Sequence, residues 1–438
     1  MSRTGCNFRL ARATAPCYAS PKKSWPNYLG SGGPRFSTLM KKMLFLAAAL
    51  PLAGGLAAHK PAPAALFVTV RNRLSVARPA ETISLPLSQL KALGPATSLR
   101  GVVVEDAQTQ AVLTSQLLDS NADGQPDELL FQAALPAKGT RQFVLAAGAP
   151  APVPADGPTT FARFVPERTD DFAWENERVA FRTYGPNAEQ LFDKKDPNGT
   201  LSSGMDCWLK RVPYPIIDKW YGRHVHEKPF AYHTDIGEGY DPYHVGTSRG
   251  VGGTGVLDGG KLYISKNFTS YKVLATGPIR TVFELTYAPW DANGRSVTEK
   301  KIISLDLGSN LTRYEEKLTA DKPLPNCTIG LTLHEAKGEV KADRQAGWCR
   351  YWEKIDDSCL GTGVVVAPRY LLDYQDHRSA EKDQSQLYMV TKPTQGTVVF
   401  YAGFGWQKSG QFATAADWDA YLAAFAQRLA SPLEVTVK

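Results

Sequence analysis

Residues 280–287 read RTVFELTY, and this stretch carries the pattern that decides the fold. Apolar and polar side chains alternate along it, most regularly in its second half, as in a β-strand with one buried face. The same period of two occurs at residues 179–184, 261–265 and 396–401. Strands of this kind bury their apolar faces against one another. The chain is therefore predicted to be mainly β, with a large antiparallel sandwich of two sheets.

Shorter strands precede this region. Segments rich in β-branched and aromatic residues, separated by turn residues, occur at residues 66–70, 82–87, 102–105 and 141–145. This spacing predicts a smaller β-sandwich region at residues 66–150. Proline-rich sequence at 149–154 marks a boundary. Residues 160–438 are predicted to form the larger domain, a β-supersandwich.

One amphipathic helix is expected at residues 414–430. Its apolar side chains recur at helical spacing, at Trp418, Leu422, Phe425 and Leu429. A stripe of this kind is typical of core packing rather than of a cofactor site.

The start of the chain carries a targeting pattern rather than a fold. Residues 40–58 begin with MKKM, continue with a short apolar run and end in small residues, as a secretory signal peptide does. Residues 1–39 are predicted to be an upstream start-site artefact, and residues 59–65 a linker. The mature protein is therefore expected to be exported, to the periplasm or the outside of the cell.

Charge and cysteine content restrict the classes of partner. The net charge is +7, but part of it lies in the leader and no dense basic run follows. We expect neither nucleic-acid binding nor a membrane span, and the oligomeric state stays open. Four cysteines lie outside the leader, Cys207, Cys327, Cys349 and Cys359. An exported protein permits disulfides, with Cys349 and Cys359 closest in sequence, but buried free thiols fit equally well.

Residues 232–250 read YHTDIGEGYDPYHVGTSRG, and titratable groups are concentrated there among glycines. Glycine and proline predict a loop, and loops that carry such side chains often form binding or catalytic sites. The alternative is an ordinary polar surface loop. The candidate residues from this stretch are His233, Asp235, Glu238, Tyr240, His244 and Arg249.

Two further segments mix aromatic and charged residues. A strand through residues 174–182 would place Trp174, Asn176 and Arg178 on one face and Glu175 on the other. That face suits a sugar ring and its polar groups, and it suits a salt-bridged sheet equally well. Residues 207–221 contain two prolines and are predicted to be an irregular connection. Their candidates for holding an anionic substrate or stacking on it are Lys210, Arg211 and Tyr221.

Metal and cofactor motifs are weak. Asp119, Asn121, Asp123 and Asp127 repeat as in the start of a calcium loop, with Gly124 sixth, but Leu130 replaces the final glutamate. We expect either a structural Ca²⁺ site or an unmetallated Asx-rich turn. His224 and His226 alternate as on a strand, without a zinc motif. The glycines at 250–255 match the spacing of a dinucleotide fingerprint, but a strand and not a helix is expected to follow them. No cofactor is expected to be required for chemistry.

With these residues the chain resembles a family of exported bacterial proteins that carry domain of unknown function 4861 and are commonly encoded in polysaccharide-utilisation loci. The resemblance rests on residues 119–132, 174–186, 205–221, 232–253, 261–290 and 304–311. It implies a galactose-mutarotase-like β-supersandwich and work on oligosaccharides that contain uronic acids. Some members look like dehydratases that eliminate water from a terminal uronate.

An elimination beside a carboxylate needs a cation for that carboxylate, a base for the C5 proton and an acid for the departing oxygen. We expect Arg249, with Lys210 or Arg211, to hold the carboxylate of an anionic oligosaccharide. His233, oriented by Asp235, is the candidate base, and Tyr240 or His244 the candidate acid. Three alternatives remain: a glycoside hydrolase with a carboxylate pair such as Glu175 and Glu238, a sugar epimerase, and a non-catalytic carbohydrate-binding protein.

Overall fold

The computed structural model describes residues 65–94, 101–148 and 157–438. These residues fall within one compact unit, Pro61–Lys438. The predicted start-site artefact, the signal peptide and all but the last residue of the linker lie outside the described residues. Among the residues described, no helix is long and apolar enough to cross a membrane.

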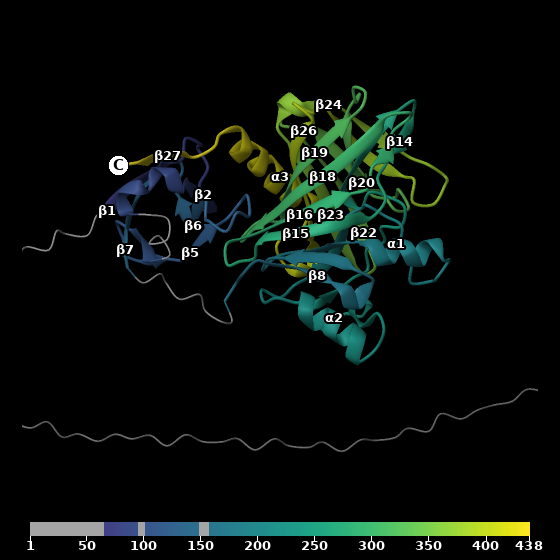
Figure 1. Ribbon diagram of the computed structural model, residues 1–438, viewed down its shortest axis with the longest axis horizontal. Helices are drawn as coiled ribbons and strands as arrows, with labels where there is room; N and C mark the ends of the chain where they lie inside the picture. Colours follow the sequence, from purple (N-terminus) through teal and green to yellow (C-terminus); the bar gives the residue numbers. More distant parts are fainter. Residues whose placement is uncertain (1–64, 95–100, 149–156) are drawn as a thin grey trace, which may run out of the picture. The chain divides into compact units, whose positions relative to one another are not determined.

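A small β-sandwich begins the described chain (Figure 1). One sheet has the order β27-β1-β7-β3-β4, with β27 at Glu434–Val437, β1 at Ala65–Arg71, β7 at Thr140–Ala147, β3 at Val102–Asp106 and β4 at Val112–Leu113. The facing sheet has the order β2-β6-β5, with β2 at Arg78–Pro86, β6 at Glu128–Leu135 and β5 at Ser115–Leu118. Their alternate apolar residues form a separate core that includes Val68, Phe131 and Leu145. Strand β27 pairs with β1, so the last strand of the chain belongs to its first sheet.

The large sandwich follows, and every strand pair in it is antiparallel. Its largest sheet runs β15-β16-β18-β19-β26-β23-β22-β21, with β17 paired to β18. The strands span β15 Phe268–Ala275, β16 Arg280–Tyr287, β17 Trp290–Asp291, β18 Ser296–Asp306, β19 Leu311–Ala320, β21 Glu339–Asp343, β22 Trp348–Ile355, β23 Ser358–Val366 and β26 Thr397–Trp406.

Two five-stranded sheets complete this region. One has the order β14-β13-β20-β25-β24, with strands at Lys261–Tyr263, Val251–Asp258, Cys327–Thr332, Gln386–Thr391 and Leu371–His377. The other has the order β12-β11-β10-β9-β8, with strands at Gly239–Tyr240, Asp206–Lys210, Ala180–Thr183, Asp171–Glu175 and Phe161–Val165.

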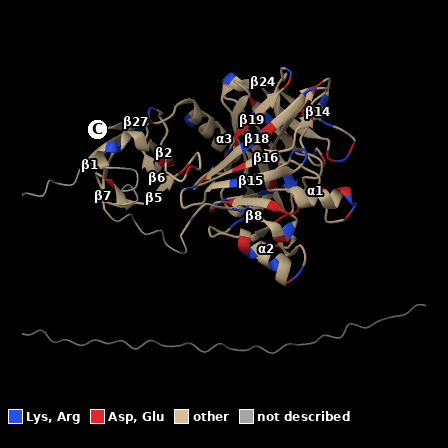
Figure 2. Cartoon of the chain, in the orientation of Figure 1, with Lys and Arg blue, Asp and Glu red and all other residues tan. Residues whose placement is uncertain are grey.

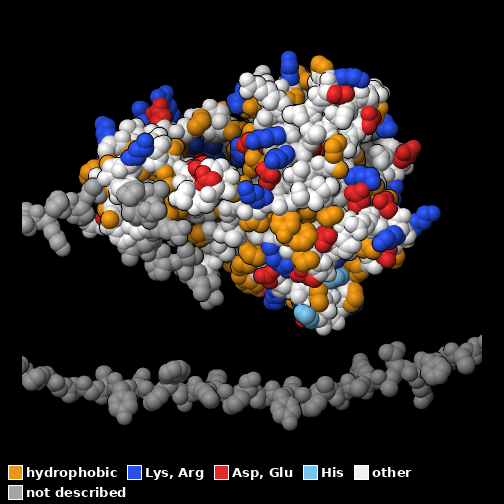
Figure 3. Space-filling view, viewed as in Figure 1, with side chains coloured by type: hydrophobic (Ala, Val, Ile, Leu, Met, Phe, Trp, Pro, Cys, Tyr) orange, Lys and Arg blue, Asp and Glu red, His pale blue; other side chains and the backbone are white. Residues whose placement is uncertain are grey.

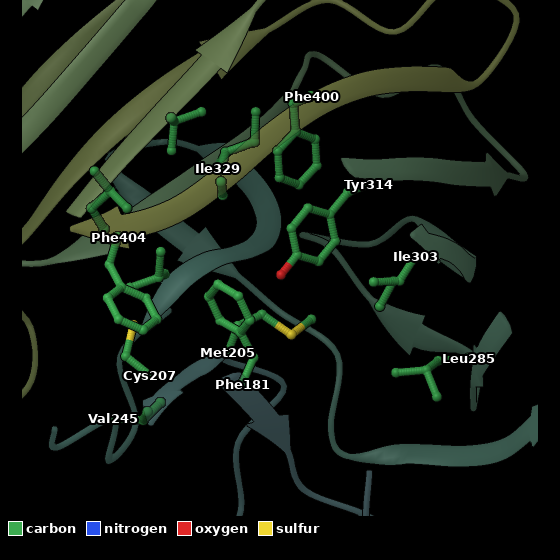
Figure 4. Packing of buried hydrophobic residues seen from close by; sticks show 14 of the residues in the cluster. Phe181, Met205, Cys207, Val245, Leu285, Ile303, Tyr314, Ile329, Phe400 and Phe404 are labelled. Carbon is green, nitrogen blue, oxygen red and sulfur yellow. The ribbon is translucent and has the colours of Figure 1, made fainter. Parts of the chain in front are cut away.

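Side chains from all three sheets meet in one apolar core. Figure 4 shows Tyr314 and Phe400 from the largest sheet beside Ile329 of β20, with Phe181 and Cys207 entering from β10 and β11. The rings of Tyr314 and Phe400 stack with their centroids 4.9 Å apart. This shared core confirms the predicted mainly β class, with a small sandwich before a large antiparallel region. That region contains three sheets rather than the two expected.

The expected helix is present as α3, Ala415–Ala430. Thr414 caps it by accepting a hydrogen bond from the Asp417 amide, and the Asp417 side chain accepts from the Thr414 amide in return. Trp418 and Leu422 are buried, as predicted for core packing. Two glycines of β23 make room for them, because a Cβ at Gly361 would approach Trp418 within 2.6 Å and one at Gly363 would approach Leu422 within 2.9 Å.

Two shorter helices were not expected, α1 at Pro186–Asp193 and α2 at Ile217–His226. The predictions that residues 207–221 form an irregular connection and that His224 and His226 share a strand were therefore wrong. Residues 207–210 belong to the internal strand β11, and Pro213 and Pro215 lie between that strand and α2. Both prolines lie where no ladder hydrogen bond is required of them.

Acidic and basic residues are interspersed over the described strands rather than gathered on one face (Figure 2). The four cysteines outside the leader are free; Cys207, Cys327 and Cys349 are buried and Cys359 is partly exposed. Of the two alternatives, free thiols are therefore the one observed.

Candidate active site

A cleft of about 490 Å³ gathers histidines, carboxylates and lysines on the large sandwich. Three segments form it: the loop between β12 and β13, the loop between β20 and β21, and the β22–β23 hairpin. Side chains that line it include His244, His334, Tyr351, Glu353, Lys354 and Asp356. A concave site with convergent titratable groups is the usual setting for binding or catalysis.

His334 lies in this cleft with both ring nitrogens occupied. Nδ1 lies 2.6 Å from a Glu353 carboxylate oxygen, and Nε2 lies 3.0 Å from the carbonyl oxygen of His244. Both partners accept hydrogen bonds when Glu353 is ionised, so this geometry favours the doubly protonated ring, an imidazolium. Burial alone would lower the pKa of His334, but Glu353 and the carbonyl raise it, and the net direction is upward. The backbone of His334 has φ +44°, in the left-handed region that a non-glycine residue seldom adopts.

Of the two histidines in the cleft, His244 has one ring nitrogen without a hydrogen-bond partner in the described part of the chain. Its Nε2 lies 3.1 Å from Asp383 Oδ1, and since a carboxylate only accepts, Nε2 carries the proton. Nδ1 is therefore left as a proton acceptor on a side chain that is 55% exposed. Gly246 permits this pairing, because a Cβ there would collide with the Asp383 carboxylate.

Tyr240 and Arg211 do not line the cleft themselves, but Tyr240 contacts it through Asp356. The Tyr240 hydroxyl donates to the carboxylate of Asp356, which lines the cleft. Burial and this carboxylate raise the pKa of Tyr240, so its hydroxyl stays protonated at neutral pH. Arg211 pairs with Asp235 at 2.8 Å and lies 5.8 Å from the Trp406 ring centre. We had expected Asp235 to orient His233. It positions Arg211 instead.

A buried charge network fixes the loop that carries Tyr240 and His244. Arg182 of β10 donates to Asp206 at 2.7 Å and to Asp241 at 2.8 Å, and lies 3.5 Å from Asp171. All three aspartates are fully buried. Burial raises the pKa of Asp206 to about 7 and that of Asp241 to about 6. Asp241 lies next to Tyr240 in sequence, so this network links the loop to the sheet.

His233 lies outside the residues that line the cleft. It ends a short 3-10 helix, Ala231–His233, where its Nδ1 donates to the Asp241 carbonyl oxygen at 2.6 Å. Its side chain is 47% exposed and stacks on Phe230. Burial and the neighbouring Arg182 lower the pKa of His233. The geometry favours His244 over His233 as a base that acts in this cleft.

Several predicted substrate contacts are buried structural side chains. Trp174, Glu175, Lys210, Tyr221 and Arg249 have at most 1% of their surface exposed. Trp174 Nε1 donates to Thr312 Oγ1 at 3.0 Å within the core. The strand that we expected to continue through Arg178 ends at Glu175, so Trp174 and Arg178 do not share a face. These five side chains cannot stack on a sugar or reach a carboxylate from solvent.

Buried charges among these residues pair with each other. Lys210 Nζ donates to Glu175 at 2.7 Å, and Glu175 also accepts from the amides of Ile216 and Ile217 at the start of α2. Glu238 is tied to Lys219, Tyr214 and Trp220. Glu175 and Glu238, the carboxylate pair considered for a hydrolase, are therefore each bound to other protein groups, which does not fit a catalytic pair.

Arg249 is the exception, because its Nε has no partner among the described residues. Its Nη1 donates to Ser203 at 2.9 Å, and burial lowers its pKa to about 10. Arg178 keeps 39% of its side chain exposed beside Glu177, away from the residues that line the cleft.

The predicted calcium loop forms the turn between β5 and β6. Asp119 accepts from the amides of Asp123 and Gly124, and Asp127 accepts from Ser120 and Asn121. This is the bonding of an Asx-rich turn. Within the described residues, no group of three or more His, Cys, Asp or Glu side chains is arranged to hold a metal ion.

Sequence reasoning missed His334, Glu353, Asp356 and Asp383. Each comes from a segment far from residues 232–250, so only the fold brings them together. One signal was present: Glu353 and Asp356 lie in WEKIDD, at the turn of a strongly patterned hairpin.

Comparison with known proteins places the chain among uncharacterised relatives. A family model described as Domain of unknown function (DUF4861) matches residues 70–435. The chain is 44% identical over 380 residues to "Uncharacterized protein P7" of Formosa agariphila, covering 85% of this chain and 93% of that protein.

Two solved structures from Enterococcus faecalis are distantly similar. A protein in glycosyl hydrolase family 38 matches at 10% identity and TM-score 0.45, and an α-mannosidase at 11% identity and TM-score 0.42. Each match covers 85% of this chain, which spans about half the length of those two proteins, 47% and 46%.

Proposed function

This chain belongs to the family described as Domain of unknown function (DUF4861), and we propose that it is a carbohydrate-active enzyme of the carbon–oxygen lyase class. Its substrate is an oligosaccharide that ends in a uronic acid, and its reaction is a β-elimination. The observation that carries this proposal is the cleft in which His244, with an open Nδ1, lies beside the imidazolium of His334.

The residues of the cleft match the needs of an elimination. Lys354, which lines it, holds the uronate carboxylate. The N–H groups of His334 already donate to Glu353 and to the His244 carbonyl, so His334 contributes only its nearby positive charge, which helps to make the C5 proton more acidic. His244 Nδ1 takes that proton, and the electron pair of the C5–H bond becomes the C4=C5 double bond. The C4–O bond breaks, and the leaving oxygen takes a proton from Tyr240. It departs as water from a free hydroxyl, or as a sugar hydroxyl from a glycosidic bond.

Neighbouring carboxylates keep these groups in the required protonation states. Asp383 fixes the tautomer of His244, Glu353 keeps His334 charged, and Asp356 holds the Tyr240 hydroxyl at the end of the cleft. No step requires a metal or an organic cofactor. Export from the cell and an anionic substrate are part of this proposal. Residues 119–127 keep two alternatives, a structural Ca²⁺ site and an unmetallated Asx-rich turn.

A pair of matched histidine variants tests the assignment. His244→Gln should lower kcat by about 10²–10⁴, the usual contribution of a positioned base. His233→Gln is the control, because His233 is similarly exposed but lies outside the residues that line the cleft. Tyr240→Phe should lower kcat with little change in KM. Equal turnover by the two histidine variants, with intact circular dichroism, would remove His244 from the mechanism.

A glycoside hydrolase is the second candidate, because three carboxylates, Glu335, Glu353 and Asp356, line the same cleft and can supply the pair that hydrolysis needs. Hydrolysis adds water across the glycosidic bond and creates no double bond. Ultraviolet absorbance of the product therefore separates the two reactions. Glu353→Gln would abolish hydrolysis, whereas elimination would continue with a shifted pH profile.

A further inference from the structure

A second cleft, of about 480 Å³, lies between the small sandwich and the large one and shares no lining residue with the candidate active site. Its walls are β2, the strands β16, β18 and β19, and one face of α3. Hydrogen bonds link the small sandwich to the largest sheet. Gln132 Nε2 donates to the Leu307 carbonyl at 2.8 Å, and Gln116 Nε2 to the Arg280 carbonyl at 2.8 Å.

Guanidinium groups outnumber carboxylates in this cleft. Arg78, Arg280, Arg313 and Arg428 line it, against Glu81 and Asp306. Arg313 also lies 3.1 Å from Glu315, which does not line the cleft. Asp306 is paired with Arg280, whereas Glu81 is shared, 3.4 Å from both Arg78 and Arg428. Each guanidinium has five N–H donors, so the four arginines together have more donors than the two carboxylates can accept. Basic side chains are visible around the position of α3 (Figure 3).

An aromatic wall faces these charges. Tyr401 and Phe425 lie edge to face with centroids 4.8 Å apart, and Tyr421 lies one turn before Phe425 on α3. Arg428 lies 5.3 Å from the Phe425 ring centre. Ser304, Ser309 and Gln132 add hydroxyl and amide groups to the same cleft. Aromatic faces bind sugar rings, hydroxyls and amides bind sugar hydroxyls, and arginine forks bind carboxylate or sulfate groups.

We propose that this second cleft is a non-catalytic binding site for an anionic saccharide. Arg313 and Arg428 hold its carboxylate or sulfate groups, and its rings lie against Tyr401 and Phe425. The cleft contains no histidine, and its only carboxylates lie beside arginines. It therefore binds without reacting. This inference does not depend on the reaction at His244, since a protein without lyase activity would still bind there.

Calorimetric titration of the mature chain tests this site. His244→Gln serves as the background, so that no ligand is consumed during the titration. The probes are a hexameric uronate oligosaccharide, a sulfated oligosaccharide of the same length and a neutral one. The anionic probes should bind and weaken as salt rises, whereas the neutral probe should bind at least tenfold more weakly.

Arg313→Gln with Arg428→Gln should weaken binding at this site by at least about tenfold, since each removes charge-assisted hydrogen bonds. Arg344→Gln is the control, because Arg344 is 58% exposed and lines neither cleft. Preference between the two anionic probes identifies the acidic group. Isotherms that match between the double variant and the control would overturn the proposal, as would equal binding of the neutral probe or no anion binding at all.

Discussion

Replacing Arg182 by methionine removes the cation that three buried aspartates share. Asp171, Asp206 and Asp241 lie 3.5, 2.7 and 2.8 Å from its guanidinium nitrogens. Methionine fills a similar volume but leaves these carboxylates with one nearby cation, Arg168, which is itself buried. Breaking a buried ion pair in this way costs about 3–5 kcal/mol of unfolding free energy.

The loss of unfolding free energy in Arg182→Met should depend on pH, and it should be larger at high pH than at low pH. The folded pKa values of Asp206 and Asp241, about 7 and about 6, lie above the ordinary value of 3.8. A carboxyl group whose pKa is raised by folding contributes to stability. This contribution is fully present below the unfolded pKa and is lost as pH rises through the folded pKa. Without Arg182 both values rise further. The destabilisation should therefore be larger at about pH 8 than at about pH 5.5, by at least about 1.4 kcal/mol, the worth of one pKa unit.

Urea unfolding of Arg182→Met at the two pH values measures this difference. Arg344→Met is the matched control, because Arg344 is 58% exposed and forms a surface ion pair with Asp373; it should change stability by less than about 0.5 kcal/mol at either pH. A loss below about 1 kcal/mol at the higher pH, or a loss of equal size at both, would refute the reasoning.

Three other predictions concern separate parts of the chain. Trp174→Ala should destabilise the protein by about 3–5 kcal/mol in urea unfolding, because it empties a fully buried site and leaves Thr312 without its donor; a loss below about 1 kcal/mol would contradict this placement. Glu353→Gln should lower the pKa of His334 in an NMR titration, since it removes the adjacent carboxylate; an unchanged pKa would show that this pair is not formed. If residues 119–127 hold calcium, adding Ca²⁺ should raise Tm in the parent chain and not in Asp123→Ala; an unchanged Tm in both would leave an Asx-rich turn.

Strand pattern and helix spacing were readable from the sequence because both depend on local periodicity. Residues 280–287 form β16 over the same eight positions, and the helix expected at 414–430 forms α3 with Thr414 as its cap. Alternation and capping require only near neighbours in the chain.

Burial of charged residues was not readable, since it depends on partners far along the chain. Lys210 looked like a ligand for an anionic substrate, but Glu175, 35 residues earlier, neutralises it inside the sheet. The prediction of the candidate active site was incomplete for the same reason. His244 was identified, yet Asp383 lies 139 residues from it and His334 lies 90 residues away. Only the fold brings the loop before β13, the loop after β20 and Asp383 close to one another.

The most direct test of the proposed reaction is to incubate the mature protein with a panel of uronate-terminated oligosaccharides and to record product mass and ultraviolet absorbance together. The proposed elimination predicts new absorbance from a C4=C5 double bond, with loss of one water or with chain cleavage, and no such product from His244→Gln. Cleavage with addition of water and without new absorbance would contradict it and indicate a hydrolase. An unchanged panel would contradict the proposed substrate class.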